Sequence, residues 1–565
     1  AGDTYADNLG ETTIANIYEV PMKAYVIDTE EEFSTEHCPT WISMDTIYSA
    51  NFDNSFYDFR PTSTSCWFYG LNNLTSVVNA DKLNTSNVTD MSFMFQDAGF
   101  NATTWSIGNL SGWDTSNVIN MANMFNSAGF NASTFNISNL GGWDTGNVIN
   151  MRSMFGGFGY KTTTWSIGDI GGWNVDSVVD MSGMFNGAGY TATTWDIGDL
   201  SGWDTSNATD LSLMFYIAGC NATTWNVGDL GGWDTGNATN MSLMFSYAGY
   251  AATTWNVGDL GGWDTGNVTD MSGMFSYAGY SVTTFNVGDL GDWNTGSVTN
   301  MSYMFDSAGR SATTWSIGDL SGWSTGNVAN MESMFNGAGY NATTWNVGDL
   351  GGWDTGNIIN MSSMFENAGY NAIAWHIGDL GGWDTSAVTN TKRMFYSAGY
   401  NATAFDIGNL GGWDTGNMTN MYYLFHNAGH NATVWNIGNI GGWDTSNVTD
   451  MCSMFAVAGY NATTWDIGDL SGWNTSNVTN MESMFNGAGY SATVFDVGDL
   501  SGWSTGNVTN MYRMFYNTGR NAATWNIGTI SGWNVAKVWN HTGFITLNVH
   551  QSNIATVNGQ PHWRS

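Results

Sequence analysis

Residues 210–239 read DLSLMFYIAGCNATTWNVGDLGGWDTGNAT, and close copies of this 30-residue stretch follow one another along most of the chain. From Asp90 onward about fifteen copies keep the same length, and the last one decays after Ile530. A strict period of this length indicates a solenoid, in which one unit cannot bury its own apolar residues but stacked units share a core. A chain of this kind presents a long surface instead of a single cleft.

The composition excludes several classes of protein. Hydrophobic residues make up 42% of the chain and aromatic residues 15%, which is ample for a packed interior. The 48 Asp and Glu residues exceed the 12 Lys and Arg residues and give a net charge of -36. Such a surface repels nucleic acid and anionic membranes, and no apolar run is long enough to span a bilayer. The chain begins with Ala1-Gly2-Asp3, as we expect of a secreted protein after removal of its signal peptide.

Each copy predicts one short helix. Asp210 is a suitable N-cap, and Gly219 is Gly in every copy, as a left-handed helix end requires. Between them, apolar residues recur at the i, i+3, i+4, i+7 spacing of a buried helical stripe. The stripe consists of Leu211, Met214, Phe215 and Ala218. We therefore expect a two-turn helix over 211–218.

The second half of each copy predicts a strand and two turns. Residues 224–228 alternate between outward and inward positions, and the Trp225 position is always Trp or Phe. No proline interrupts the copies, so each coil can donate backbone N–H groups to the next. These features predict an α/β solenoid, a right-handed leucine-rich-repeat-like stack of about fifteen coils. The residues expected in its core are Trp225, Val227, Leu230, Trp233, Met244, Phe245 and Val268, with their equivalents.

The repeats also resemble a known family. Residues 203–207 read WDTSN and residues 443–455 read WDTSNVTDMCSMF. This is similar to the W-D-T-S-N-V-T-x-M-x-x-M-F repeat of BspA-like bacterial surface proteins, and the match covers about four-fifths of the chain. The resemblance implies export, a leucine-rich-repeat-like solenoid and adhesion to host proteins, other cells or surfaces. The unit is longer here, through the AGYNATTWNVGDL stretch.

The layout that we expect has three parts: an N-terminal region (1–80) that caps the stack or serves in assembly, the repeat solenoid (81–535) and a C-terminal β cap (536–565). Cys38 and Cys66 both lie in the first part and are candidates for a disulfide, which suits an oxidising exterior. Cys220 and Cys452 lie several copies apart, so we expect both to be free.

The sequence shows no recognisable set of catalytic residues, and we predict that the protein is not an enzyme. No Ser-His-Asp spacing, zinc-ligand pattern or phosphate loop occurs. Three histidines near the C-terminus are a weak alternative metal site. These are His541, His550 and His562.

One column of acidic residues needs an explanation. It includes Asp199, Asp229, Asp259 and Asp289, which occupy one position in successive coils. Like charges about 4.8 Å apart repel by roughly 1 kcal/mol per pair even in bulk water. Calcium bridging the carboxylates would offset this repulsion, and so would an Asx-turn in which each Asp accepts a backbone N–H. Asn replaces Asp at the same position in other copies, which favours the turn. The sequence therefore predicts no required cofactor, with calcium as the alternative.

Asn-x-Ser/Thr triplets recur just after the turn that ends the expected helix, and they are candidate N-glycosylation sites. They begin at Asn101, Asn221, Asn341, Asn401, Asn431 and Asn461. The alternative is that the triplet is copied with the repeat. The two positions after the repeat Phe vary most, as in Tyr216-Ile217 and Ser246-Tyr247. Either a partner is recognised there or the positions are unconstrained.

The sequence therefore predicts a non-enzymatic protein, extracellular or on the cell surface, with an adhesive or structural role. Host or neighbouring-cell proteins or glycans are the expected partners. A head-to-tail filament is the first alternative, because a solenoid has two open ends and one chain's end can complete the next. A glycan-binding protein or carbohydrate-active enzyme is the second.

Overall fold

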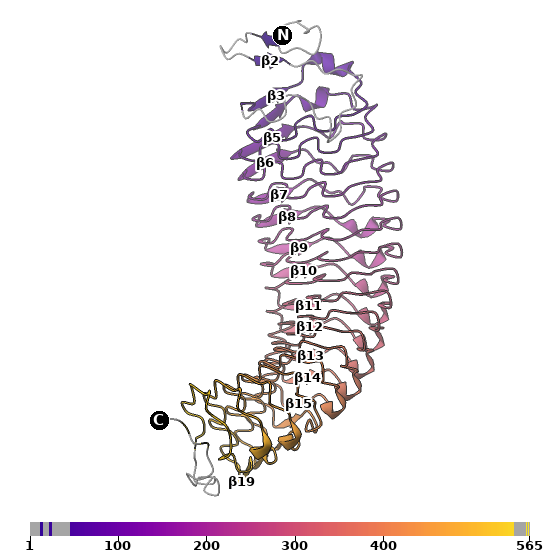
Figure 1. Cartoon of the computed structure of the whole chain (residues 1–565). Coiled ribbons are helices and arrows are strands. Elements are labelled where there is room, and N and C mark those ends of the chain that lie inside the picture. The colour runs from indigo at the N-terminus through magenta and orange to yellow at the C-terminus, as the bar shows by residue number, and fades with distance from the viewer. Residues whose placement is uncertain (1–11, 15–21, 25–45, 547–560, 562, 564–565) are drawn as a thin grey trace. The chain divides into compact units, whose positions relative to one another are not determined.

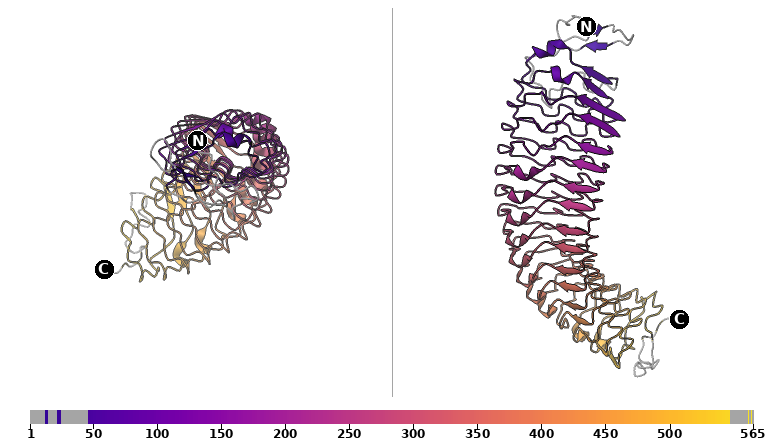
Figure 2. Two further views of the ribbon diagram at one scale, coloured as in Figure 1. Left: turned by 90° about the horizontal axis from the view of Figure 1, so that it is seen from above. Right: turned by 180° about the vertical axis from the view of Figure 1, so that it is seen from behind.

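The computed structural model describes residues 12–14, 22–24, 46–546, 561 and 563 (Figure 1). The chain divides into two compact units. Unit 1 comprises Ala1–Ala238 and Ala248–Ala252, and unit 2 comprises Thr239–Tyr247 and Thr253–Ser565. Each unit is a β-solenoid whose coils repeat every 30 residues, and within each unit the strands lie along one edge of the coils (Figure 2).

The regular elements of both units are short strands and 3-10 helices, joined by turns. In unit 1 these are β1 (Thr12–Ile14), β2 (Met22–Ala24), β3 (Ser49–Asn51), η1 (Asn54–Tyr57), β4 (Ser76–Val78), η2 (Ala80–Lys82), β5 (Thr104–Gly108), β6 (Thr134–Ile137), β7 (Thr164–Ser166), β8 (Thr194–Asp196), η3 (Leu200–Gly202), β9 (Thr224–Asn226) and η4 (Leu230–Gly232).

In unit 2 they are β10 (Thr254–Asn256), η5 (Leu260–Gly262), β11 (Thr284–Asn286), η6 (Leu290–Asp292), β12 (Thr314–Ser316), η7 (Leu320–Gly322), β13 (Thr344–Asn346), η8 (Leu350–Gly352), β14 (Ala374–His376), η9 (Leu380–Gly382), β15 (Ala404–Asp406), η10 (Leu410–Gly412), β16 (Val434–Asn436), β17 (Trp465–Asp466), η11 (Leu470–Gly472), β18 (Val494–Asp496), η12 (Leu500–Gly502) and β19 (Thr524–Asn526).

The strands of the coils pair in parallel with the equivalent strand of a neighbouring coil, mostly two by two, as β7 with β8, β11 with β12 and β13 with β14. In β11 and β12, Thr284 pairs with Thr314 and Asn286 with Ser316, a shift of one full repeat. The ladder starts before the first repeat copy, because β3 pairs in parallel with β4 and β4 with β5. Within each unit, isolated parallel bridges also join the Asp or Asn that opens one copy to that of the next, as Asp90 to Asn120 in unit 1 and Asp270 to Asn300 in unit 2. The exception is β1, which pairs antiparallel with β2.

The α/β prediction was wrong in one respect: no α-helix occurs among the described residues, and the expected helix over 211–218 is a run of turns. The equivalent segment one coil earlier shows the reason. Gly183, Phe185 and Gly187 donate their N–H groups to the next coil, to the carbonyls of Ser212, Met214 and Tyr216. Those carbonyls are therefore not used for i→i−4 bonds. Neighbouring coils lie roughly 4.8 Å apart, whereas an α-helix is about 10 Å wide, so a ladder on this side excludes a helix.

The core was predicted correctly although the backbone was not. The stripe Leu211, Met214, Phe215 and Ala218 is fully buried, and so are the seven residues expected in the core, apart from 2% exposure at Trp233. Buried Phe rings stack in register along the coils, for example Phe335 on Phe365 with ring centroids 5.6 Å apart. Apolar residues at the i, i+3, i+4 spacing thus face inward from consecutive turns as they would from a helix.

Left-handed residues make the turn segment possible. In the copy from Asp210, Leu213 and Ile217 have φ of 58° and 51°, and these two positions are left-handed throughout the repeats. A non-glycine residue in this region costs roughly 1–2 kcal/mol, which the hydrogen bonds between coils offset. Several copies place Gly there, as at Gly183 and Gly187. Glycines inside an expected helix were the signal in the sequence that the segment is not helical.

Candidate functional site: the strand face

The exposed face of the strands carries the same polar groups in coil after coil. In β11, Phe285 points into the core, as does Val287 just after the strand, while Thr284 and Asn286 are exposed because successive side chains of a strand alternate. Four consecutive copies in unit 2 keep this arrangement and define three rows. The tied threonine row is Thr253, Thr283, Thr313 and Thr343; the outer threonine row is Thr254, Thr284, Thr314 and Thr344; the amide row is Asn256, Asn286, Ser316 and Asn346.

The two threonine rows differ in hydrogen bonding. In the tied threonine row, the Thr313 hydroxyl donates to the Thr283 carbonyl at 3.3 Å, and Thr343 donates to Thr313 at the same distance. In the outer threonine row, the hydroxyls of Thr284 and Thr314 have no hydrogen-bond partner among the described residues. The outer threonine row therefore presents unpaired hydroxyl groups to solvent.

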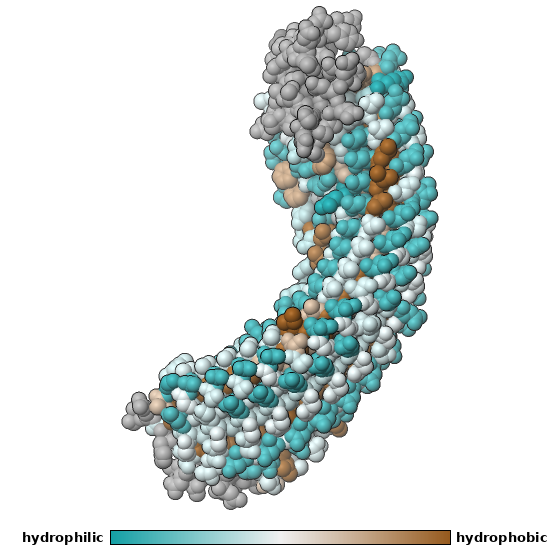
Figure 3. Space-filling view, turned by 45° about the vertical axis from the view of Figure 1, so that its right-hand side comes forward, coloured by the Kyte–Doolittle hydropathy of each residue, from teal (hydrophilic) through white to brown (hydrophobic). Residues whose placement is uncertain are grey.

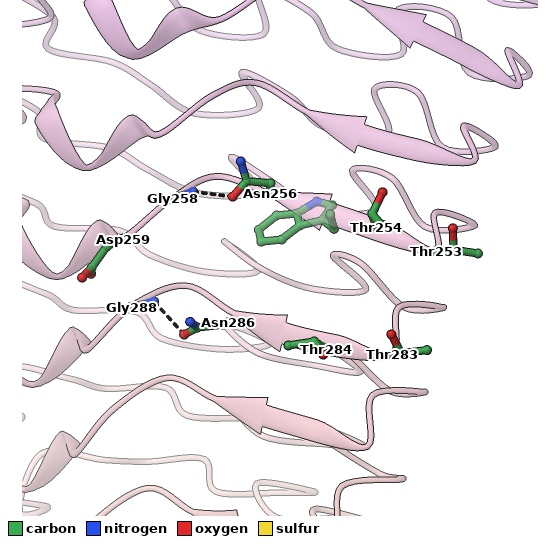
Figure 4. A pocket seen from close by; sticks show the side chains of 10 residues that line it. Thr253, Thr254, Asn256, Gly258, Asp259, Thr283, Thr284, Asn286 and Gly288 are labelled. Carbon is green, nitrogen blue, oxygen red and sulfur yellow. Dashed lines mark hydrogen bonds between the residues drawn. The ribbon is translucent and has the colours of Figure 1, made fainter.

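The amide row is held by a tight turn at its end. Asn256 accepts a hydrogen bond from the Gly258 N–H at 3.2 Å, and Asn286 accepts one from Gly288 at 3.1 Å (Figure 4). Gly288 has a φ of 89°, and a Cβ atom there would lie 1.8 Å from Oδ1 of Asp259. Only glycine fits this position, both for its left-handed backbone and for the close approach of the preceding coil.

The Asp column lies directly beyond this turn, and its members Asp199, Asp229, Asp259 and Asp289 each open a 3-10 helix. Asp199 accepts from the Ser201 N–H at 3.0 Å, and Asp229, Asp259 and Asp289 accept from the N–H two residues ahead at 2.9–3.0 Å. This is the Asx-turn that the sequence favoured. Hydrogen bonds from the Ser201 N–H and hydroxyl lower the pKa of the Asp199 carboxyl. Among the described residues, no group of three or more His, Cys, Asp or Glu is arranged to hold a metal ion.

Shallow grooves lie on the strand face of both units. In unit 2 a groove of about 490 Å³ runs between β10 and β11, lined by threonines of both rows, by Asn256 and Asn286 and by Asp259 (Figure 4). In unit 1 the equivalent groove, about 440 Å³, lies between β8 and β9. The Trp side chains beneath them, Trp255 and Trp195, are only 8% and 4% exposed. The grooves thus offer hydroxyl, amide and carboxylate groups but no aromatic platform.

The sequence matches the family model described as "Mycoplasma protein of unknown function, DUF285" over residues 62–165, 129–255, 218–342, 246–371, 339–437 and 429–556. The chain belongs to this family. The overlapping matches follow the repeats through both units. No curated protein and no solved structure showed a significant match to the chain. Within the described part of this DUF285 protein, no helix has the length and apolar character that crossing a bilayer requires.

The glycosylation candidates of this DUF285 chain fall into two groups. One group forms an asparagine ladder, in which each side-chain amide donates to the Oδ1 of the preceding coil at 2.6–2.9 Å. The ladder is Asn341, Asn371, Asn401, Asn431 and Asn461. Asn371 is followed by Ala-Ile and forms no triplet, so the ladder explains these asparagines without glycosylation. Asn101 contacts Asn73 at 3.5 Å, whereas Asn221 is exposed and its side chain has no partner among the described residues.

Within the described residues, the cysteines and histidines form no metal-binding group. Cys66 is buried and disulfide-bonded, and Cys38, its expected partner, lies outside the described residues. Cys220 and Cys452 are free and buried, as expected. His541 stacks on Trp563 with centroids 4.3 Å apart. His550 and His562, the other members of the alternative metal site, lie outside the described residues.

An aromatic column on the turn segment was missed in the sequence analysis. Half-buried rings stack face to face with centroids 4.4–4.8 Å apart. The column is Tyr340, Tyr370, Tyr400, His430, Tyr460 and Tyr490. Burial, with Tyr340 and Tyr400 on either side, raises the pKa of Tyr370 to about 12. Its signal was the aromatic residue that follows the repeat Ala-Gly in most copies.

Proposed function

We propose that this protein is a non-enzymatic extracellular surface protein with an adhesive or structural role. The observation that carries the proposal is the strand face, where identical polar groups repeat in register over successive coils. A small-molecule site is usually concave and largely enclosed, whereas this surface is extended and periodic. It suits a large or repetitive partner, such as a matrix protein, a glycan or another cell's surface.

The resemblance of the repeats to BspA-like surface proteins supports the same role. The excess of 48 acidic over 12 basic residues supports it as well, since a strongly charged protein stays soluble and resists non-specific association. Figure 3 shows that the face in view is mostly hydrophilic, with a few small groups of hydrophobic residues.

The packing at the C-terminal end bears on the filament alternative. Trp563 stacks on His541 and lies 4.9 Å, centroid to centroid, from Phe544 of the last coil. Phe544 in turn contacts Phe515 of the coil before it. This packing favours a covered end over an open joint, so we propose a capped binding protein rather than a filament subunit.

A binding screen tests the proposed function. The purified full-length chain is presented to immobilised matrix proteins, a glycan array and whole cells, with bovine serum albumin as the control surface. We expect saturable binding to at least one class at physiological salt. Turnover of a glycan by the protein alone, or the absence of binding to all three classes, would overturn the proposal.

A further inference from the structure

We propose that the strand face of unit 2 between Thr253 and Asn346 binds a neutral, extended polysaccharide chain along the stack of coils. This inference rests on the proposed function and names the class of partner. Its first ground is the outer threonine row, whose hydroxyls are exposed and lack partners within the described protein. A hydroxyl group both donates and accepts hydrogen bonds. Each threonine of the outer row, which forms one rung per coil, can therefore act as donor or as acceptor towards a sugar hydroxyl.

The second ground is that the three rows themselves carry no charged side chain; the carboxylates beside them belong to the Asp column, such as Asp259, which lines the groove. The amide row contains Asn256, Asn286, Ser316 and Asn346, and no Lys or Arg occurs in any of the three rows. Elsewhere in unit 2 the amide-row position is acidic, as at Asp406 and Asp466. Protein interfaces favour aromatic residues and Arg at their centre, and this surface exposes neither. Hydroxyl and amide groups without charge are suited to a neutral, hydroxyl-rich ligand.

The third ground is spacing. Equivalent side chains of paired parallel strands recur about every 4.8 Å, and Thr284 and Thr314 pair directly. One pyranose unit of an extended β-1,4-linked glucan advances by a closely similar length. Successive sugars of such a chain can therefore lie over successive coils, and because adjacent sugars present alternate edges, the same edge meets every second coil. The rungs are fixed by hydrogen bonds between coils, so little conformational entropy is lost on binding.

The fourth ground is that the three rows end abruptly. In the coil after Thr344 the row positions are occupied by Ile373 and Ala374, and later coils place Ala404 and Val434 in the outer position. Ile373 is 61% exposed and Val434 is 51% exposed. Without hydroxyls in the outer position, these three coils cannot continue the contacts of the outer threonine row. The groove between β10 and β11 lies within the uninterrupted part.

The test removes hydroxyls without changing shape. In the variant Thr284→Val/Thr314→Val/Thr344→Val, the new side chain is one that the chain itself uses at this position, at Val434 and Val494. The control is Thr389→Val/Thr419→Val/Thr449→Val, an exposed threonine row on another part of the coil whose hydroxyls donate to carbonyls of the preceding coil at 3.2–3.4 Å. Binding of cellohexaose, chitohexaose and oligogalacturonate to the full-length chain is measured by isothermal titration calorimetry.

We expect the wild type and the control variant to bind one of the neutral hexasaccharides with equal Kd. Neither should bind the charged oligogalacturonate. The strand-face variant should bind on the order of tenfold more weakly, because several hydrogen bonds are lost. An unchanged Kd in the strand-face variant, an equal loss in the control, or no binding of either neutral probe would overturn this inference. If the wild type still binds matrix proteins or cells in that last case, the proposed function stands without it.

Discussion

The indole Nε1 of Trp353 donates a hydrogen bond of 3.0 Å to the carbonyl oxygen of Leu320 in the preceding coil. Equivalent bonds of 2.8–3.1 Å recur along this tryptophan column, as from Trp143 to Leu110 and from Trp473 to Ile440. The second aromatic column, which contains Trp345, accepts Phe at Phe285 and Phe405. The first column is Trp in every copy, because only Trp combines the ring with an N–H donor that links coils.

This contrast predicts different effects of the same substitution in one coil. Trp353→Phe loses the bond to Leu320 and leaves a gap, so we expect it to lower the free energy of unfolding by about 1–3 kcal/mol. Trp345→Phe removes a buried N–H that has no partner among the described residues, and it should cost less than the Trp353 change. Urea denaturation followed by circular dichroism measures both. Equal losses would contradict the assigned role of the Nε1 bond.

A second prediction concerns Gly288, which has a φ of 89° and lies against Asp259. Gly288→Ala should lower the free energy of unfolding by several kcal/mol, on the order of 3, because the new Cβ displaces the carboxylate of the preceding coil. Gly352→Ala is the control, since a Cβ there meets nothing within 4 Å. Thermal melts of the two variants should separate clearly, and a stable Gly288→Ala variant would show that the turn can relax.

At the left-handed positions we predict a substitution that raises the free energy of unfolding. Val457 is β-branched and has a φ of 52°, whereas Asn367 and Asn427 occupy the same position in other copies. Asn tolerates this region better than Val, so Val457→Asn should raise the free energy of unfolding by about 1 kcal/mol. Differential scanning calorimetry checks the change. A drop in Tm would indicate that the Val457 side chain contributes more through packing than its backbone costs.

The buried carboxyl of Asp306 predicts a pH effect. Burial raises its pKa to about 7, a nearby Glu366 adds to the rise, and the Ser307 hydroxyl and Arg310 oppose it. In the unfolded chain the Asp306 carboxyl has the ordinary aspartate pKa of about 4. Between about pH 4 and 7 the folded chain therefore keeps a proton on this carboxyl that the unfolded chain has released. Since the folded state binds more protons between these values, this group's contribution to stability falls as pH rises from about 4 to 7.

Asp306→Asn isolates this effect, because Asn336 occupies the same position one coil later. We expect the variant to be more stable than the wild type at pH 8, by about 2–4 kcal/mol, and the difference to shrink towards pH 4. Urea denaturation at several pH values measures the difference directly. A difference that does not change with pH would mean that Asp306 is ionised throughout, and the predicted titration would then be wrong.

The sequence by itself determined the solenoid, the repeat length, the core and the Asx-turns. The period alone requires like residues to stack, and a position that is apolar in every copy must face the shared interior, as Met244 and Phe245 do. The Asn or Asp that precedes each 3-10 helix forms the same local hydrogen bond whatever surrounds it. For this reason Asp199 could be assigned to a turn from the sequence.

Only the tertiary structure decided the backbone of the turn segment and the roles of the exposed residues. The spacing of Leu211, Met214 and Phe215 fits a helix and a run of inward-facing turns equally well. The choice depends on whether backbone groups bond within the coil or to the next one, which no local pattern records. The tied and outer threonine rows have the same residue type. Only the path of the chain brings the hydroxyls of the tied row to backbone carbonyls of the preceding coil and leaves those of the outer row, such as Thr284, without a hydrogen bond within the described residues. Hydrogen bonds between coils thus decided what the sequence left open, because they join residues 30 positions apart.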